Sequence, residues 1–462
     1  MNCDNLFYYK ESNFNKKKSL SNFIYVIVDI SGLLQKKEIK YKIGNLIKNE
    51  PRWNKIIKES FIGLYWEPNL FDYEKHFYYK KKKKYNQYRF MNKILNKGLK
   101  KDRPMWKLYM INDTKNTHLI FKCHHIYGDG YYLMKEVFIK YFIDKPIQFT
   151  NNNSFGKKCL KELKCEKLKC EKLKCEKKCS GVLNKNLYFK KYIFKLFFII
   201  LIPIYFFFFG VYFFLYSLNN LIQNFYFEKI FEEKLDNNMK SCHLYELDVL
   251  RCKKLKNKYN VSMNTLIHFI IFKTIQNYKQ TYNKKYDKNT KINYISTFST
   301  NLTHKTEYIN TYPFVESINL ISNKEKIHSK KENITSIKKL NRVLSNYKLF
   351  IKAISEYSYF SSISGLIINK FTHKFINKIY NFNTKFFNVG ISNFHSFLKK
   401  NKINNREILN IHNFVVMRES KLLFTCCSYN NIINLNIVYQ NNILNYKKLK
   451  NSLKNVLLEL SY

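Results

Sequence analysis

The chain of 462 residues is poor in acidic residues, glycine and proline. Asp and Glu number 33 against 82 Lys and Arg, which gives a formal net charge of +49. Clustered cations would indicate nucleic-acid binding. Here the lysines are scattered among abundant Asn, Ile, Tyr and Phe, while Gly and Pro number only 11 and 6. This pattern favours a solvated cationic surface, so we expect no nucleic-acid partner.

Paired cysteines are also lacking. Five of the 11 cysteines lie in one low-complexity segment and the others are dispersed. The polar N-terminus shows no cleavable signal peptide. These features exclude a disulfide framework and favour a reducing, cytosol-facing location.

One long hydrophobic run stands out. Residues 196–218 carry no charge and follow Lys190, Lys191 and Lys195. Their length suits a bilayer core, which a helix of about 20 residues crosses, and the lysine side should face the cytosol. A buried core helix is the alternative, but so many aromatic residues without a polar face favour a membrane segment. Because Pro203 and Gly210 allow a bend, we expect a re-entrant hairpin that leaves both flanking regions on the cytosolic side.

A low-complexity linker precedes this run. The five-residue unit Lys-Cys-Glu-Lys-Leu repeats from Lys164 onward, a period that matches neither a helical nor a strand face. The spacing is not that of a zinc site. An expanded linker explains it, and S-acylation of Cys170 and Cys175 is a second hypothesis because they precede the hydrophobic run. The chain thus divides into lobes at 1–150 and 240–462, a linker at 151–190 and a membrane segment at 191–225.

The most informative stretch is Cys123-His124-His125-Ile126-Tyr127-Gly128-Asp129-Gly130. Residues 119–123 before it alternate as in a buried strand, and apolar residues within 133–142 recur at helical spacing after it. The histidines are therefore predicted where a strand gives way to a loop and a helix, with Asp129 near the helix N-cap. Rigid scaffolds commonly present reactive groups at such places.

These residue types suit proton transfer. Histidine takes up and returns a proton near neutral pH, and neighbouring side chains on a strand point to opposite faces. We predict His125 as the general base, His124 as its buried support, and Asp129 as an anion that fixes the loop through an unidentified Arg or Lys. Gly128 and Gly130 supply the turn. A metal site or two core histidines are the alternatives; no third ligand stands at useful spacing nearby, so we expect no metal.

The pattern HHxxxDG at 124–130 resembles the signature of the chloramphenicol-acetyltransferase-like acyltransferases. These include peptide-synthetase condensation domains and the wax ester synthase/diacylglycerol acyltransferase (WS/DGAT) family. Segments 51–53 (PRW), 66–76 (WEPNLFDYEKH) and 102–106 (DRPMW) resemble landmarks of the WS/DGAT family and occur in its order. The resemblance implies an α/β fold of two lobes with a cleft or tunnel between them, here with the inserted membrane segment.

Local patterns place elements in both lobes. In the first, strands are predicted at 23–30, 106–110 and 117–123, a helix at 39–47 and a turn at Asn112-Asp113. In the second, helices are predicted at 247–258 and 265–278, strands at 294–298 and 316–320, and family landmarks at 389–393, 427–429 and 457–460.

The second lobe departs from the family pattern. Asn264 precedes its long helix as in the family, but Ser392-Asn393 is followed by Phe394 instead of a Gly-Pro turn. In the first lobe, Lys100 stands where the family usually has an acid. Backbone N–H groups near Gly128 and the amide of Asn393 are predicted to bind substrate and stabilise charge on its carbonyl oxygen.

The resemblance implies an acyl-CoA-dependent O-acyltransferase that converts a fatty alcohol or diacylglycerol to wax ester or triacylglycerol. Acyl-CoA would be a co-substrate, with no cofactor, and the partners would be a lipid alcohol and membrane lipids. We expect a location at a membrane, that of the endoplasmic reticulum, with both lobes facing the cytosol. The alternative is a catalytically decayed membrane protein that binds lipid or acts as a scaffold. A condensation domain is disfavoured because no carrier-protein or adenylation segment is present.

Overall fold

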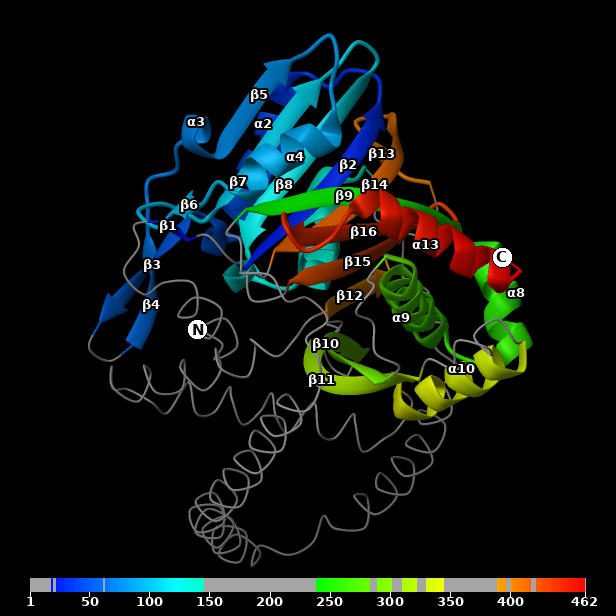
Figure 1. Ribbon diagram of the computed structural model, residues 1–462. Helices are drawn as coiled ribbons and strands as arrows, with labels where there is room; N and C mark the ends of the chain where they lie inside the picture. The colour runs from blue at the N-terminus through cyan, green and yellow to red at the C-terminus, as the bar shows by residue number, and fades with distance from the viewer. Residues whose placement is uncertain are drawn as a thin grey trace, which may run out of the picture. The chain divides into compact units, whose positions relative to one another are not determined.

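The computed structural model (Figure 1) describes residues 18–19, 22–60, 63–144, 238–282, 289–300, 310–321, 330–344, 389–395, 400–416 and 421–461. All of them belong to one compact unit made of residues 1–146 and 224–462. Two six-stranded mixed sheets with helices form this unit, so the predicted α/β class is confirmed. The predicted linker and membrane segment lie outside the described residues.

The first sheet has the strand order β13-β14-β2-β8-β7-β5. Its strands are β2 (Phe23–Ser31), β5 (Phe77–Lys81), β7 (Trp106–Asn112), β8 (Asn116–His124), β13 (Lys402–Ile403) and β14 (Arg406–Val416). The predicted strands at 23–30, 106–110 and 117–123 and the turn between the last two are confirmed. In that turn the Oδ1 atom of Asp113 accepts hydrogen bonds from the N–H groups of Lys115 and Asn116, at 2.8 and 2.7 Å.

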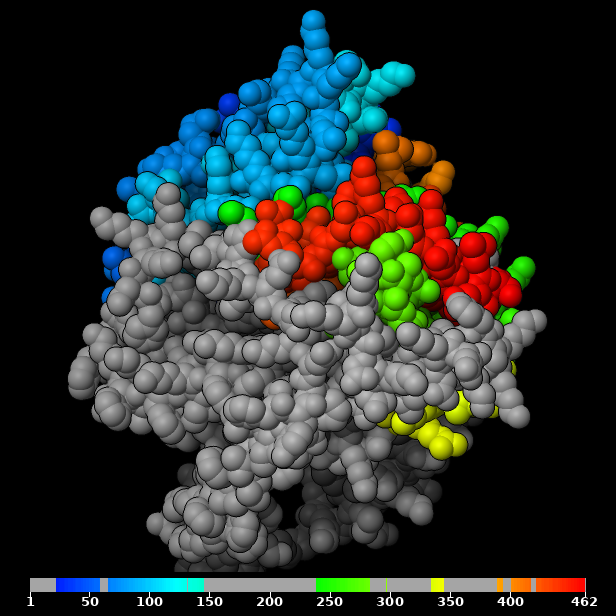
Figure 2. Space-filling view, in the orientation of Figure 1, coloured from blue at the N-terminus to red at the C-terminus, as the bar shows by residue number. Residues whose placement is uncertain are grey.

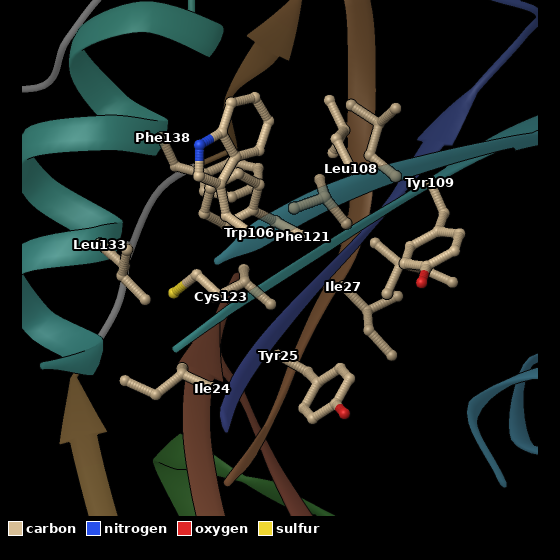
Figure 3. Close-up of a cluster of buried hydrophobic side chains, with 14 of the residues drawn as sticks. Ile24, Tyr25, Ile27, Trp106, Leu108, Tyr109, Phe121, Cys123, Leu133 and Phe138 are labelled. Atoms are coloured by element: carbon tan, nitrogen blue, oxygen red, sulfur yellow. The ribbon is translucent and has the colours of Figure 1, made fainter. Parts of the chain in front are cut away.

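Both faces of this sheet are covered, which is why β2 is apolar almost throughout. On one face pack α2 (Lys36–Asn49) and η3 (Leu133–Phe142); Figure 3 shows Leu133 and Phe138 directed at Trp106, Phe121 and Cys123 of the strands. On the other face lies α4 (Gln87–Leu95), whose Ile94 carbonyl accepts a hydrogen bond from Tyr25 Oη at 3.4 Å.

The helix after the histidines differs from the prediction in its geometry. Residues 133–142 form a π-helix, and the N–H of Ile143 donates to the carbonyl of Phe138, five residues back, at 3.1 Å. Its turns are wider than those of an α-helix. Apolar residues at helical spacing nevertheless face the sheet, because Leu133, Val137 and Phe138 are all buried.

Short elements complete the first lobe. They are β1 (Lys18–Ser19), η1 (Pro51–Asn54), β3 (Lys55–Ser60), β4 (Gly63–Pro68), α3 (Tyr73–His76), β6 (Leu99–Lys100), η2 (His125–Tyr127) and α5 (Gly130–Tyr132). Among them, β1 pairs with β6 and β3 pairs with β4, and each pair forms a separate two-stranded sheet.

The second sheet has the order β11-β10-β12-β15-β16-β9. Its strands are β9 (Met239–Asp248), β10 (Asn289–Thr300), β11 (Asn310–Ile321), β12 (Val389–His395), β15 (Leu422–Tyr429) and β16 (Ile432–Gln440); its helices are α8 (Val249–Tyr259), α9 (Met263–Tyr282), α10 (Lys330–Leu344) and α13 (Tyr446–Glu459). Figure 2 shows α13 at the surface, where Leu458 is among the exposed apolar side chains.

The second-lobe predictions hold with one correction. Both helices and both strands are present, but the first helix begins at Val249 and not at Leu247. Leu247 and Asp248 still pair with β16, opposite Ile433 and Ile432. Asp248 then caps α8, since its Oδ1 accepts from the N–H of Arg251 at 2.7 Å.

Residues 400–416 connect the two sheets. The chain leaves β12, enters the first sheet as β14 beside β2, and returns to the second sheet as β15. Hydrogen bonds then link the sheets: the Thr425 hydroxyl donates to the Asn413 carbonyl at 2.7 Å, and the Tyr429 hydroxyl to the Ile408 carbonyl at 2.9 Å. A strand from the C-terminal half thus completes the sheet that carries the histidines.

Candidate active site

The histidines lie where the prediction places them, at the end of a central strand. His124 is the last residue of β8, and His125 opens the 3₁₀ turn η2. The backbone N–H of His125 donates to the carbonyl of Asn22 at 2.8 Å, and the N–H of His124 donates to that of Met105 at 2.9 Å. The start of β2 and the segment before β7 therefore hold the backbone of this turn on both sides.

His124 is fully buried and holds the turn. Its Nδ1 accepts a hydrogen bond from the N–H of Ile126 at 3.2 Å, and its ring meets Phe23 edge to face at 5.7 Å. Burial, together with the smaller effects of the His125 and Lys101 charges, lowers the pKa of His124 to about 3. A neutral ring that accepts at Nδ1 fits the predicted supporting position.

His125 is partly exposed, unlike its neighbour. Burial lowers the pKa of His125, while the carboxylate of Asp129 opposes part of that shift. The imidazole is therefore neutral near pH 7, which is the form that can accept a proton.

The rest of the motif shapes the loop. Asp129 caps the following helix, because its Oδ1 accepts from the N–H of Tyr132 at 2.7 Å. This cap is one contact through which Asp129 fixes the loop, and its pairing with an Arg or Lys stays a prediction. Gly130 is the first residue of α5. Gly128 has φ = 152°, and a β-carbon there would lie 2.7 Å from Cγ of Tyr132. Only glycine fits this position without strain.

A cluster of aromatic side chains packs against the histidine turn. Tyr127 stacks on Trp53 with ring centroids 4.5 Å apart, and Trp66 lies 5.5 Å from Tyr127. The indole N–H of Trp106 donates to the Trp53 carbonyl at 2.7 Å, and the Tyr127 hydroxyl accepts from the N–H of Met105 at 3.1 Å. All three tryptophans of the chain thus gather beneath the histidine turn, and the sequence landmarks at 51–53, 66–76 and 102–106 meet here.

Two further residues of this region were missed from the sequence. Tyr127 lies inside the motif at an unassigned position. Lys122, which alternation predicts to be polar and outward, is fully buried, and its Nζ donates to the carbonyls of Ile94, at 2.9 Å, and Lys97. The ammonium group also lies 4.3 Å from the ring centroid of Phe23. It therefore satisfies carbonyls at the C-terminal end of α4.

Asn393 lies in the second sheet, on β12. Its Nδ2 donates to Oδ1 of Asn264 at 3.0 Å, which links two positions that the sequence singled out separately. The ring of His268 contacts Asn264 as well. Its Nδ1 lies 2.8 Å from the Asn264 carbonyl, and its Nε2 lies 2.9 Å from Oγ of Ser296. The contact of Asn393 with substrate, and a cleft between the lobes, stay predictions.

No group of three or more His, Cys, Asp or Glu side chains that could hold a metal occurs among the described residues. Cys123, next to His124, is a buried thiol whose pKa burial raises well above its ordinary value. A pocket of about 650 Å³ between α2 and η3 is lined by Asn45, Asn49, Lys140 and Tyr141, and by none of the predicted site residues.

The membrane predictions concern residues outside this part of the chain. Within the ranges that the structure describes, no helix is both long and apolar enough to cross a bilayer. Residues 196–218, Pro203, Gly210 and the linker cysteines lie outside the described ranges, so the hairpin and the S-acylation stay predictions.

Comparison with known proteins finds similarity to one family in the C-terminal part of the chain and to several solved structures in the fold. Residues 325–461 match the family model of the WS/DGAT C-terminal domain. Among solved structures, the chain resembles the wax ester synthase/diacylglycerol acyltransferase from Marinobacter aquaeolei VT8, with a TM-score of 0.54, 12% identity, and 99% of this chain and 97% of that chain covered.

Two other solved structures share the fold. Trichothecene 15-O-acetyltransferase TRI3 from Fusarium sporotrichioides gives a TM-score of 0.60 at 10% identity, covering 99% of this chain and 94% of that chain. A starter condensation domain of rhizomide synthetase RzmA, with C8-CoA and Leu-SNAC, gives 0.54 at 7% identity, covering 100% and 94%. A search of curated protein sequences finds no match.

Proposed function

We propose that this chain transfers an acyl group from acyl-CoA to the hydroxyl of a lipid alcohol, because residues 325–461 match the WS/DGAT C-terminal domain and the fold resembles that of a solved wax ester synthase/diacylglycerol acyltransferase. The acceptor would be a fatty alcohol or diacylglycerol and the product a wax ester or triacylglycerol. The observation that carries this proposal is a neutral, partly exposed His125 held at the end of a central strand by its backbone and its neighbours.

The chemistry needs one proton acceptor. The imidazole of His125 takes the proton from the acceptor hydroxyl as its oxygen attacks the thioester carbonyl. The carbon–sulfur bond then breaks, and the imidazolium returns the proton to the departing thiolate of coenzyme A. Because the thioester is already activated, no covalent enzyme intermediate is needed. Such acid–base assistance typically contributes about 10²–10⁴-fold in rate.

Neighbouring residues support this role without taking part in bond changes. His124 keeps the turn in place as a neutral, buried ring, and Asp129 caps the helix that follows. The Asp129 carboxylate would also stabilise the imidazolium that forms during transfer, since its charge raises the pKa of His125. The amide of Asn393 and the N–H groups near Gly128 are candidates for binding the thioester oxygen.

The test is ester formation from labelled acyl-CoA and a mixture of fatty alcohol and diacylglycerol. We expect His125→Gln to lower the rate by about 10²–10⁴-fold. His243→Gln, at a partly buried histidine of β9, serves as the control and should retain activity. Full activity of the His125 variant would exclude this base. Absence of any ester with the wild-type protein would instead support the lipid-binding or scaffold alternative.

A further inference from the structure

A strongly basic loop borders the histidine turn. Residues 97–107 contain five cations, at Lys97, Lys100, Lys101, Arg103 and Lys107, and one carboxylate, at Asp102. Lys97 and Lys100 are exposed, and the other three cations are partly exposed. We call residues 97–107 the basic loop.

The fold brings the charges of this loop together. Lys100 lies in β6, where the register sets it directly opposite Lys18 of β1. Like charges at opposite positions of a strand pair are destabilising. Burial lowers the pKa of Lys107, and the charges of Arg103 and Lys97 lower it further, so both of these cations lie close enough to Lys107 to repel it. Such crowding is relieved when an anion binds between the cations.

The one carboxylate of the loop is already engaged. Asp102 lies beside Arg103, with Oδ1 3.0 Å from Nε and Oδ2 3.4 Å from Nη2. One carboxylate cannot neutralise five cations, so the loop keeps a large excess of positive charge.

The basic loop is fixed to the histidine turn by its backbone. At Met105 the carbonyl accepts from the N–H of His124 at 2.9 Å, and the N–H donates to the Tyr127 hydroxyl at 3.1 Å. Lys101 is close enough for its charge to act on the ring of His124. A ligand bound through its phosphates to this loop would therefore have its other end near the turn that carries His125.

We propose that the basic loop binds the phosphate groups of the acyl-CoA co-substrate, a role that rests on the proposed function. Coenzyme A carries a diphosphate and a 3′-phosphate at one end and the thioester at the other. Several lysines and an arginine in one loop suit such a ligand, because lysine binds phosphate as a point charge and arginine can bind it through two parallel hydrogen bonds. With its phosphates at the basic loop, acyl-CoA would have its thioester end directed toward His125.

The test uses the full chain and two variants with the same change in net charge. The first replaces Lys97, Lys100 and Lys107 of the basic loop with Gln. Each variant is assayed with acyl-CoA and with the acyl-N-acetylcysteamine thioester, which has no phosphate. We expect the ratio of kcat/KM for acyl-CoA to that for the phosphate-free thioester to fall about tenfold or more, since each exposed ion pair contributes modestly and three are removed.

The control variant carries Lys253→Gln, Lys254→Gln and Lys454→Gln, at exposed lysines of α8 and α13. Its ratio should equal that of the wild type. Calorimetric titration with free coenzyme A needs no turnover, so it tests the loop even if no ester is formed. The loop variant should bind coenzyme A about tenfold more weakly than the control.

Two results would overturn the assignment. Equal coenzyme A affinity and equal kcat/KM ratios in the two variants would show that the loop does not bind the phosphates. Unchanged coenzyme A binding with lost binding to phosphatidylserine vesicles would show that the loop binds a lipid headgroup. If acyl-CoA gives no turnover but coenzyme A still binds in a loop-dependent way, the proposed function fails and this site stands.

Discussion

Replacing Gly128 with alanine should damage the histidine turn by an amount that the structure allows us to work out. At φ = 152° an alanine is strained, at a cost of about 1–2 kcal/mol. Its β-carbon would lie 2.7 Å from Cγ and 3.0 Å from Cβ of Tyr132. These atoms lie next to the backbone of Tyr132, so the first turn after the motif must move. Together we expect a loss of about 3 kcal/mol in the free energy of unfolding.

Activity should fall further than stability alone explains. The turn also positions the imidazole of His125, and a misplacement of about 1 Å can lower a rate by about 10²-fold. The free energy of unfolding is measured by urea denaturation, and kcat/KM is measured on the folded fraction. We expect kcat/KM of the Gly128→Ala variant to fall by about 10²-fold.

Two comparison variants make this prediction specific. Gly44 lies within α2, and its added β-carbon would meet only the hydroxyl end of Tyr73, at 3.0 Å. Gly44→Ala should therefore be neutral or stabilising by up to about 1 kcal/mol. Tyr132→Ala combined with Gly128→Ala removes the collision and keeps the backbone strain, so it should restore part of the stability. The reasoning is refuted if Gly128→Ala is as stable and active as Gly44→Ala.

Three further predictions follow from the charges around the motif and the sheet. Asp129→Asn removes the charge that raises the pKa of His125, so the acid limb of kcat/KM should move to lower pH in a pH–rate profile; an unmoved or raised limb would contradict the coupling. Lys122→Met removes a buried cation that caps α4, and urea denaturation should show a loss of about 2–3 kcal/mol, whereas an unchanged midpoint would exclude the capping role. Burial opposes the charging of His118, but the hydrogen bond to Asp29, at 2.6 Å, and nearby acidic charge raise its pKa overall. The stability from this pair is therefore full below the unfolded-state pKa of histidine and is lost as pH rises through the raised folded-state pKa. Asp29→Asn should thus be most destabilising, by about 2 kcal/mol, near pH 6, and unfolding curves at several pH values would contradict this if the difference grew with pH.

Local patterns predicted much of the first sheet and the position of the motif. The strands at 23–30, 106–110 and 117–123 follow from runs of apolar and β-branched residues, and their strong burial keeps them close to the predicted bounds. The Asp129 cap was predictable because an aspartate before an apolar helical pattern is a common start of a helix. The cap does not test the predicted cation partner of Asp129, because one backbone N–H occupies only one acceptor site of the carboxylate.

Long-range pairing was beyond the sequence. The insertion of β14 next to β2 pairs residues about 380 positions apart, and the local pattern of neither strand indicates which strand it pairs with. The same holds for the hydrogen bond between Asn264 and Asn393, whose residues come from a helix and a strand of different parts of the chain.

The sequence by itself determined the chemistry offered at the end of β8: two adjacent histidines, a turn that needs glycine and an aspartate that can cap a helix. It could do so because these effects act within a few residues. Only the tertiary structure decided how far each histidine is buried, why Lys122 is inside, and that three distant tryptophans support one turn. Burial and the electrostatics that depend on it are set by the segments that pack around a residue, and those segments are remote in the chain.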